Sequence, residues 1–229
     1  MSAHPQAMHV VVPCRDESDA LPGHLASLAR AVELALGALP GTEVTATLVL
    51  DGCVDDSAAV VATWAQPWLE VLEVAHGCVG ATRAAGVRQA RQRGAASPEQ
   101  TWLAHTDADT EVPPDWLLHH AAACRDGLDL WLGTVRPDAD PDLTRRWLAL
   151  HTLRDDHPHV HGANLGVRLS AYDAAGGFAP LPVGEDVALV HEVRRTGGRV
   201  GAHDRAPVRT SGRLVGRAAG GFATFLAAL

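Results

Sequence analysis

The sequence predicts a single α/β domain in which a mainly parallel, Rossmann-like sheet is covered by helices on both faces. Short apolar runs alternate with helical segments through the first half of the chain, at the spacing of strand-helix-strand units. Several of these runs end directly before loops that carry acidic or basic residues, as strands do where an open sheet binds a ligand. With 229 residues, 47% of them hydrophobic, the chain is long enough to bury such a core.

The first half of the chain alternates strands with helices. Strands are expected at residues 8–12, 44–50, 69–74 and 102–104, each of them a short apolar run. Helices are expected at residues 21–39, 57–65 and 81–94, and the leucines of the first are spaced to fill one face. Because strands joined in this way are parallel, the loops at Pro13, Asp51 and Asp107 should meet at one edge of the sheet.

The second half is less regular. Helices are expected near residues 115–124 and 142–153, a strand near 128–135, and another helix opened by Gly184-Glu185-Asp186. A strand at residues 198–203 and a weak C-terminal helix end the chain. We therefore treat residues 1–229 as one domain with a first half at about 8–110, a second half at about 111–213 and a C-terminal helix at 214–229.

Charge and cysteine content exclude several classes of protein. The net charge is −8 and the chain has no lysine, which argues against a nucleic-acid partner. The four cysteines lie far apart and form no Cys-x-x-Cys pair, so neither a zinc site nor a disulfide framework is indicated. No secretion signal and no apolar run long enough to span a membrane is present, so we expect a cytoplasmic protein.

Two carboxylates directly follow the fourth strand. Asp107 and Asp109 are separated only by Ala108, and residues i and i+2 of an extended segment point the same way. Their oxygens suit Mg²⁺ or Mn²⁺ better than zinc, and an ion held there could hold a diphosphate. The alternative is a solvated acidic turn before the next helix.

Seven short motifs, in register along the chain, resemble those of the family 2 glycosyltransferases, which have the GT-A fold and use nucleotide sugars. The motifs are PCRDE at 13–17, DGCVD at 51–55, GATRAAG at 80–86, TDAD at 106–109, GANLGVR at 162–168, GGF at 176–178 and GED at 184–186. A Thr-Ser-x-Arg near the C-terminus of small bacterial members is similar to residues 210–213. The resemblance covers nearly the whole chain and implies that the first half binds the donor and the second half the acceptor. The sequence differs from the family pattern at Ala84, where the family usually has asparagine.

The resemblance assigns most of the candidate site residues to the donor. Those implied to bind the nucleotide sugar are Pro13, Arg15, Glu17, Asp51, Arg83, Asp107 and Arg213. Asp109 would be the direct metal ligand of this Asp-x-Asp motif, and Asp107 would contact the ribose or the metal through water. Arginines suit a leaving diphosphate because it concentrates negative charge, and Arg83 would lie in the first turn of its helix. Without the family, Arg83 would be a solvent-facing helix arginine and Asp51 a plain turn residue.

Catalysis requires a further carboxylate. By resemblance Asp186 is the base that takes the proton from the acceptor hydroxyl during inverting transfer, and Glu185 supports it; without the family, both would simply cap a helix. His203 could complete the metal shell, or it could be a hydrogen-bonded structural residue at a strand end. The histidines of the loop at residues 155–161 are assigned to the acceptor side rather than to zinc.

These observations predict an enzyme of the glycosyltransferase class (EC 2.4) that uses Mn²⁺ or Mg²⁺. It would move one sugar from a nucleotide diphosphate sugar to an acceptor hydroxyl, because the chain lacks the Gln-x-x-Arg-Trp segment and the membrane helices of processive synthases. The rival interpretations are a nucleotidyltransferase on a related fold, a retaining transferase, and an inactive module that binds nucleotide sugars. The sugar, the base and the acceptor are not specified by the sequence.

The end of the chain carries an apolar stripe. Its members are Leu214, Phe222, Phe225, Leu226 and Leu229. A stripe of this kind could contact a membrane surface or a second copy of the chain in a homodimer, or it could pack on its own domain.

Overall fold

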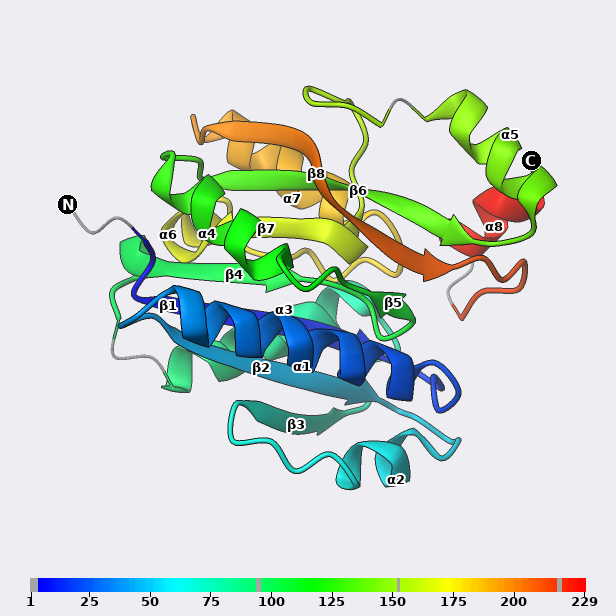
Figure 1. Ribbon diagram of the computed structural model, residues 1–229, viewed down its shortest axis with the longest axis horizontal. Coiled ribbons are helices and arrows are strands. Elements are labelled where there is room, and N and C mark those ends of the chain that lie inside the picture. The colour runs from blue at the N-terminus through cyan, green and yellow to red at the C-terminus, as the bar shows by residue number, and fades with distance from the viewer. Residues whose placement is uncertain (1–3, 94–95, 152, 218–219) are drawn as a thin grey trace.

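The first half of the chain builds the parallel part of the sheet (Figure 1). The computed structural model describes residues 4–93, 96–151, 153–217 and 220–229. Its first four strands are β1 (Ala7–Cys14), β2 (Glu43–Asp51), β3 (Leu69–Val74) and β4 (Thr101–His105). They are mutually parallel in the spatial order β3-β2-β1-β4. The segments between them contain α1 (Leu21–Ala38), α2 (Ser57–Ala62), α3 (Val79–Arg93) and the short 3₁₀ helix η1 (Pro98–Gln100).

The second half continues the same sheet with mixed directions. Its strands are β5 (Thr110–Glu111), β6 (Leu130–Asp138), β7 (Leu165–Arg168) and β8 (Val200–Ser211). β7 lies antiparallel between β4 and β6, β8 is parallel to β6, and β5 pairs antiparallel with β8 at the edge. Four of the seven neighbouring pairs among the described strands are therefore parallel. β5 and β7 are too short for a periodic signal in the sequence.

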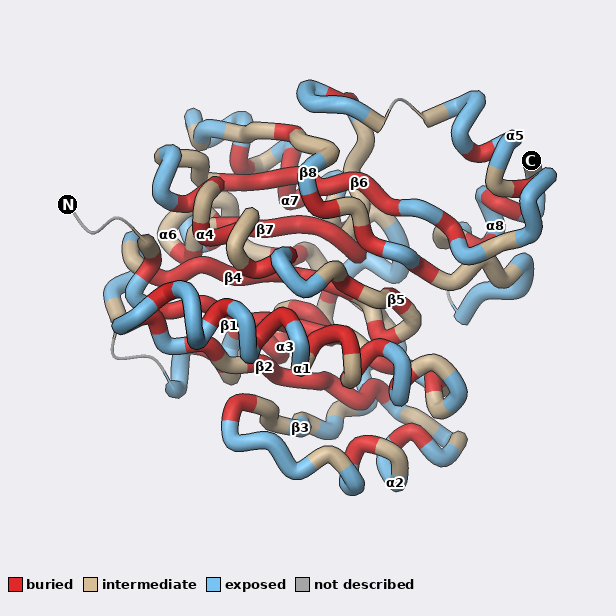
Figure 2. Tube along the Cα trace, viewed as in Figure 1, coloured by how far each residue is buried: buried red, intermediate tan, exposed pale blue. Residues whose placement is uncertain are grey.

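Helices cover both faces of the sheet, as predicted. The helices of this half are α4 (Trp116–Arg125), α5 (Pro141–Leu150), η2 (Gly162–Asn164), α6 (Leu169–Ala174), α7 (Glu185–Arg195) and α8 (Phe222–Ala227). Met8, Val10 and Val12 of β1 join the core under α1 and α4, whereas Val11 joins the core under α3, α6 and α7. Figure 2 shows the central strands buried along their length, as expected for strands covered on both faces.

Two predicted boundaries differ from the structure. β8 does not end near His203 but continues to Ser211, because its second part pairs with the end of β6 after a register shift. The C-terminal helix begins at Phe222 rather than at residue 214. Leu226 is buried in its own domain, so part of the apolar stripe packs internally. Within the described ranges, no helix combines the length and the apolar character needed to cross a bilayer.

Candidate active site

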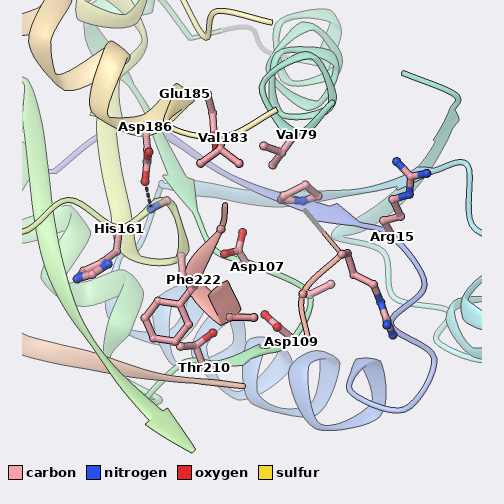
Figure 3. Close-up of a pocket in the computed structure, with 18 of the residues that line it drawn as sticks. Arg15, Val79, Asp107, Asp109, His161, Val183, Glu185, Asp186, Thr210 and Phe222 are labelled. Carbon is pink, nitrogen blue, oxygen red and sulfur yellow. Dashed lines mark hydrogen bonds between the residues drawn. The ribbon is translucent and has the colours of Figure 1, made fainter. Parts of the chain in front are cut away.

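The carboxyl ends of β1, β2 and β4 open onto a cavity of about 730 Å³, a size typical of ligand sites. The sequence-predicted residues that line it are Pro13, Arg15, Glu17, Asp51, Arg83, Asp107, Asp109, Glu185, Asp186 and Arg213. Figure 3 shows Asp107 and Asp109 on one side of this cavity and Asp186 on another. The fold thus brings together residues from both halves of the chain. Of the residues that the sequence predicts for this site, His203 does not line the cavity.

Arg83 connects the two halves of the site. It is the fifth residue of α3, just past the first turn, and it is buried rather than solvent-facing. Its guanidinium donates to the Asp107 carboxylate at 2.5 Å and to that of Glu185 at 3.1 Å. Burial works to lower the pKa of Arg83, but the charges of Asp107 and Glu185 outweigh it and raise the pKa. Arg83 therefore stays charged and fixes the Asp-x-Asp loop relative to the start of α7.

Asp186 lies at the start of α7, where its carboxylate is only partly buried. One oxygen accepts a hydrogen bond from the Gly162 amide at 2.7 Å and the other accepts from the Val187 amide at 2.8 Å. A Cβ at position 162 would lie 2.7 Å from the Arg83 guanidinium, so any residue larger than glycine here would displace Arg83. Asp186 is thus oriented at a helix start while it still lines the cavity, so the helix-cap and the functional interpretations both fit its position.

Glu185 is buried beside Asp186 and does not point into solvent. Burial raises the pKa of Glu185, and the charge of Asp186 acts in the same direction, while Arg83 opposes both. The geometry therefore fits a supporting role in which Glu185 holds Arg83 in place.

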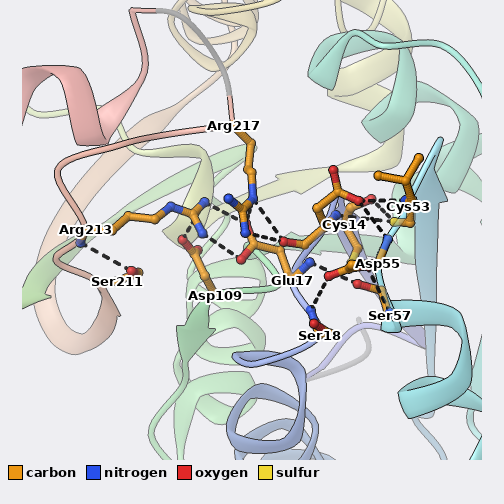
Figure 4. Close-up of polar contacts among 12 residues, drawn as sticks. Cys14, Glu17, Ser18, Cys53, Asp55, Ser57, Asp109, Ser211, Arg213 and Arg217 are labelled. Carbon is orange, nitrogen blue, oxygen red and sulfur yellow. Dashed lines mark hydrogen bonds and ion pairs between the residues drawn. The ribbon is translucent and has the colours of Figure 1, made fainter.

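Asp109 faces a second arginine, which arrives from the end of the chain (Figure 4). Pairing of β5 with β8, with Thr110 opposite Thr210, brings Arg213 next to the Asp-x-Asp loop. Arg213 donates to both oxygens of Glu17 at 2.6 Å and lies 3.1 Å from Asp109. Burial and the charge of Asp107 nevertheless raise the pKa of Asp109 to about 7, with Arg213 only partly offsetting them. This cluster of carboxylates is therefore short of positive charge.

These residues fit a divalent cation that is shared with a bound phosphate. Mg²⁺ and similar ions commonly take one or two protein carboxylates and complete their shell with phosphate oxygens and water. Asp107 and Asp109 supply two such groups beside the charge deficit described above.

A different group of potential metal ligands lies in the neighbouring loops. Among the described residues, the ligand atoms of Asp16, Cys53 and Asp55 lie within 4.8 Å of one another. Asp16 accepts from the Val54 amide at 2.7 Å, and Asp55 accepts from the Ser18 amide at 2.9 Å. These bonds tie the loop after β1 to the loop after β2, so we assign the three residues to loop anchoring.

Asp51 anchors a neighbouring loop as well. Its two oxygens accept four hydrogen bonds, from the amides of residues 76–78 and from the Thr82 hydroxyl. Burial acts to raise the pKa of Asp51, but these bonds, that of Thr82 first, bring it below its ordinary value. Since a carboxylate has about four acceptor positions, a contact with a nucleobase requires one of these bonds to be released. Pro13 lines the cavity nearby and Arg15 lies exposed at its rim.

His203 lies away from this site. It sits in the middle of β8, 3.4 Å from Asp155, and it is absent from the cavity wall. Eight residues of strand, roughly 26 Å at 3.3 Å per residue, separate it from Ser211, whose amide donates to the Asp109 carbonyl. The geometry therefore gives no support to the metal-ligand interpretation, and the reason is that the strand does not end where the sequence suggests.

Two features of the site region were missed by sequence reasoning. Asn164 of the GANLGVR motif is fully buried, accepts from Trp116 at 2.8 Å, and donates to the Thr134 and Ala206 carbonyls at 2.8 and 2.9 Å. From η2 it therefore joins the strands β6 and β8 to the helix α4. The far wall of the cavity also carries an aromatic cluster centred on Trp147, and no motif marks it. The spacing of the terminal phenylalanines was its only signal.

A protein-family model, described as glycosyl transferase family 2, matches residues 9–178 of the sequence. The chain belongs to this family. No curated protein matches the sequence. The family assignment agrees with the motifs and with the way in which the fold gathers them around one cavity.

Solved structures of glycosyltransferases have the same fold as this family 2 chain. S. aureus TarS 1–349 in complex with UDP is 16% identical, with a TM-score of 0.66 over 90% of this chain and 61% of that one. The mannosyltransferase PcManGT from Pyrobaculum calidifontis, in complex with GDP-Man and Mn²⁺, is 18% identical, with a TM-score of 0.65 over 91% of this chain and 57% of that one. The chain thus spans about three fifths of the length of each. At these identities the likeness shows the fold alone, and it confirms the GT-A prediction.

Proposed function

We propose that this family 2 glycosyltransferase moves a single sugar from a nucleotide diphosphate sugar to an acceptor hydroxyl, with inversion and with Mn²⁺ or Mg²⁺. The observation that carries the proposal is that Asp186 and the Asp107–Asp109 pair face one cavity. Arg83 links the two groups through Glu185 and Asp107. A donor bound along the Asp-x-Asp side would present its sugar toward Asp186.

The donor end combines carboxylates with arginines. Asp109 would hold the ion, and Asp107 would contact the ribose or the ion through water. When bound, the ion would neutralise charge on the leaving diphosphate. Arg213 would add a second positive charge if it turned from Glu17 toward the phosphates. The UDP complex of TarS and the GDP-Man and Mn²⁺ complex of PcManGT support a donor of this class for the present chain.

Asp186 would act on the acceptor. Its carboxylate would take the proton from the acceptor hydroxyl as that oxygen bonds to the anomeric carbon and the bond from this carbon to the diphosphate oxygen breaks. General base catalysis of this kind contributes about 10²–10⁴-fold. The bond from the Gly162 amide would orient Asp186, while Glu185 and Arg83 would act as positioning residues.

Asp186→Asn tests this assignment. The variant should lose about 10²–10⁴-fold in transfer rate while it keeps its affinity for the donor, because the amide preserves shape but cannot accept the proton. Asp126→Asn, which changes an exposed carboxylate outside the cavity, is the matched control. Wild-type turnover in Asp186→Asn would overturn the mechanism, and a product that retains the anomeric configuration of the donor would overturn inversion.

A further inference from the structure

The cavity has two chemically different ends. The donor end carries Asp107, Asp109, Arg83 and Arg213. The other end, beyond Asp186, is lined mainly by Trp147, His151, Val160, His161, Phe222 and Phe225. Among the lining residues that the structure describes between 135 and 163 and between 220 and 225, none is an acid, an arginine or a lysine.

Three separate segments build this aromatic end. Trp147 of α5 is buried, and its ring lies 5.0 Å from that of Phe222 and 5.7 Å from that of Phe225, both in α8. His161, from the loop before η2, lies 5.9 Å from the same tryptophan. Trp147 therefore supports the other rings. His161 and Phe222 line the same cavity as Asp186, and Figure 3 shows the three on the same side of it.

Large apolar side chains continue this surface to the mouth of the cavity. Val183 and Val187, which flank Glu185 and Asp186 in the chain, are 37% and 54% exposed, and Phe225 of α8 is 44% exposed. Each of these side chains lines the cavity. Exposed apolar surface of this kind gains free energy when an apolar ligand covers it.

The histidines of this end add no positive charge at neutral pH. Burial, followed by the charges of neighbouring histidines, lowers the pKa of His161 to about 3, and burial likewise lowers the pKa of His151. A phosphate or carboxylate would therefore lack a cationic partner here, and its desolvation would be costly. The donor end, by contrast, offers arginines to an anion, among them Arg83 and Arg213.

We propose that the aromatic end binds an uncharged acceptor with an apolar body and presents one of its hydroxyls to Asp186. The role of this ligand as acceptor rests on the proposed function, but its binding to the free protein does not.

Binding of two matched glycosides tests the inference. Octyl β-glucopyranoside, below its micelle concentration, and methyl β-glucopyranoside have the same hydroxyls and differ in their alkyl chain. Calorimetric titration of the donor-free protein should show the octyl compound binding at least about tenfold more tightly, since two buried methylenes suffice for that ratio. Equal affinities would overturn the proposal.

Substitutions at the rim locate the binding. Val187→Ser and Phe225→Ser should each weaken octyl glucoside binding by about fivefold or more, because each removes apolar surface from the mouth. Val71→Ser is the matched control, since Val71 is 47% exposed on β3 and does not line the cavity. An unchanged affinity in both rim variants, or an equal loss in the control, would overturn the assignment of the site.

Donor binding separates failure of this inference from failure of the proposed function. Thermal stabilisation by nucleotide sugars is measured on the same protein. If donors bind and the two glycosides bind equally, only the inference fails. If the octyl compound binds at the rim and no donor stabilises the protein, the proposed function fails and the apolar site remains. With a working donor, transfer to octyl glucoside that is no more efficient than transfer to methyl glucoside would overturn its role as acceptor.

Discussion

The two ends of the cavity differ in the charge state of their titratable side chains. At the donor end, Arg83 and Arg213 remain charged because carboxylates surround them. At the aromatic end, His161 is kept neutral by burial. The difference indicates that the donor end depends on each individual charge, whereas the aromatic end depends on total apolar surface. Substitutions should therefore have their largest effects at the donor end.

The largest effect on stability is expected for Arg83→Met. The substitution leaves Glu185 and Asp107 without their buried cation, and breaking such a pair typically costs about 3–5 kcal/mol. Urea unfolding measures the loss. Arg91→Met is the control, because the pair of Arg91 with Asp173 is more exposed and its loss should cost at most about 1 kcal/mol. Similar losses in the two variants would show that charge pairing does not organise the donor end.

Acid should destabilise the regions where burial keeps histidines neutral. His9 and His120 are buried, and burial lowers the pKa of each from 6.5 to about 3. Between these values only the unfolded chain takes up the protons, so the free energy of unfolding falls as the pH falls. Each histidine should cost about 2 kcal/mol at pH 5.

Urea titrations at pH 7.5 and pH 5 measure this slope. In His120→Gln the difference between the free energies of unfolding at the two pH values should shrink by about 2 kcal/mol, because one group that titrates only in the unfolded chain is removed. A variant with the wild-type slope would contradict the assignment of a neutral His120.

A smaller effect is expected for Arg213→Ala. Removing one cation from the donor end should raise the donor dissociation constant about tenfold, as for the loss of one charge-assisted hydrogen bond. Arg209→Ala is the control, because Arg209 lies near the end of β8, four residues before Arg213, pairs with Glu111 and does not line the cavity. Unchanged donor affinity in Arg213→Ala would show that Arg213 does not contact the donor.

The donor end could be predicted from sequence far better than the aromatic end. Asp51 is the last residue of β2 and Asp107 follows β4, and the ends of parallel strands meet wherever such a sheet forms. The hydrogen bonds that Asp51 accepts from neighbouring amides could not be predicted, because they depend on the path of the loop at residues 76–78. The sequence predicts a strand end at His203, but β8 continues to Ser211, and the polar residues within the strand hide this continuation. Trp147 and Phe225 are far apart in the sequence and come together only in the tertiary fold, so no local sequence pattern predicts their contact.

The most direct test of the account is a thermal-shift panel of uridine, guanosine and thymidine diphosphate sugars, with and without Mn²⁺, on the wild type and on Asp109→Ala. A ligand at a hundred times its dissociation constant stabilises the folded state by about 2.7 kcal/mol. We expect one nucleotide class to stabilise the wild type in a manner that depends on Mn²⁺, and we expect Asp109→Ala to lose that dependence. Asp138→Ala, in which an exposed aspartate outside the cavity is removed, should behave as the wild type. Absence of stabilisation by every donor, or an unchanged Mn²⁺ effect in Asp109→Ala, would contradict the account.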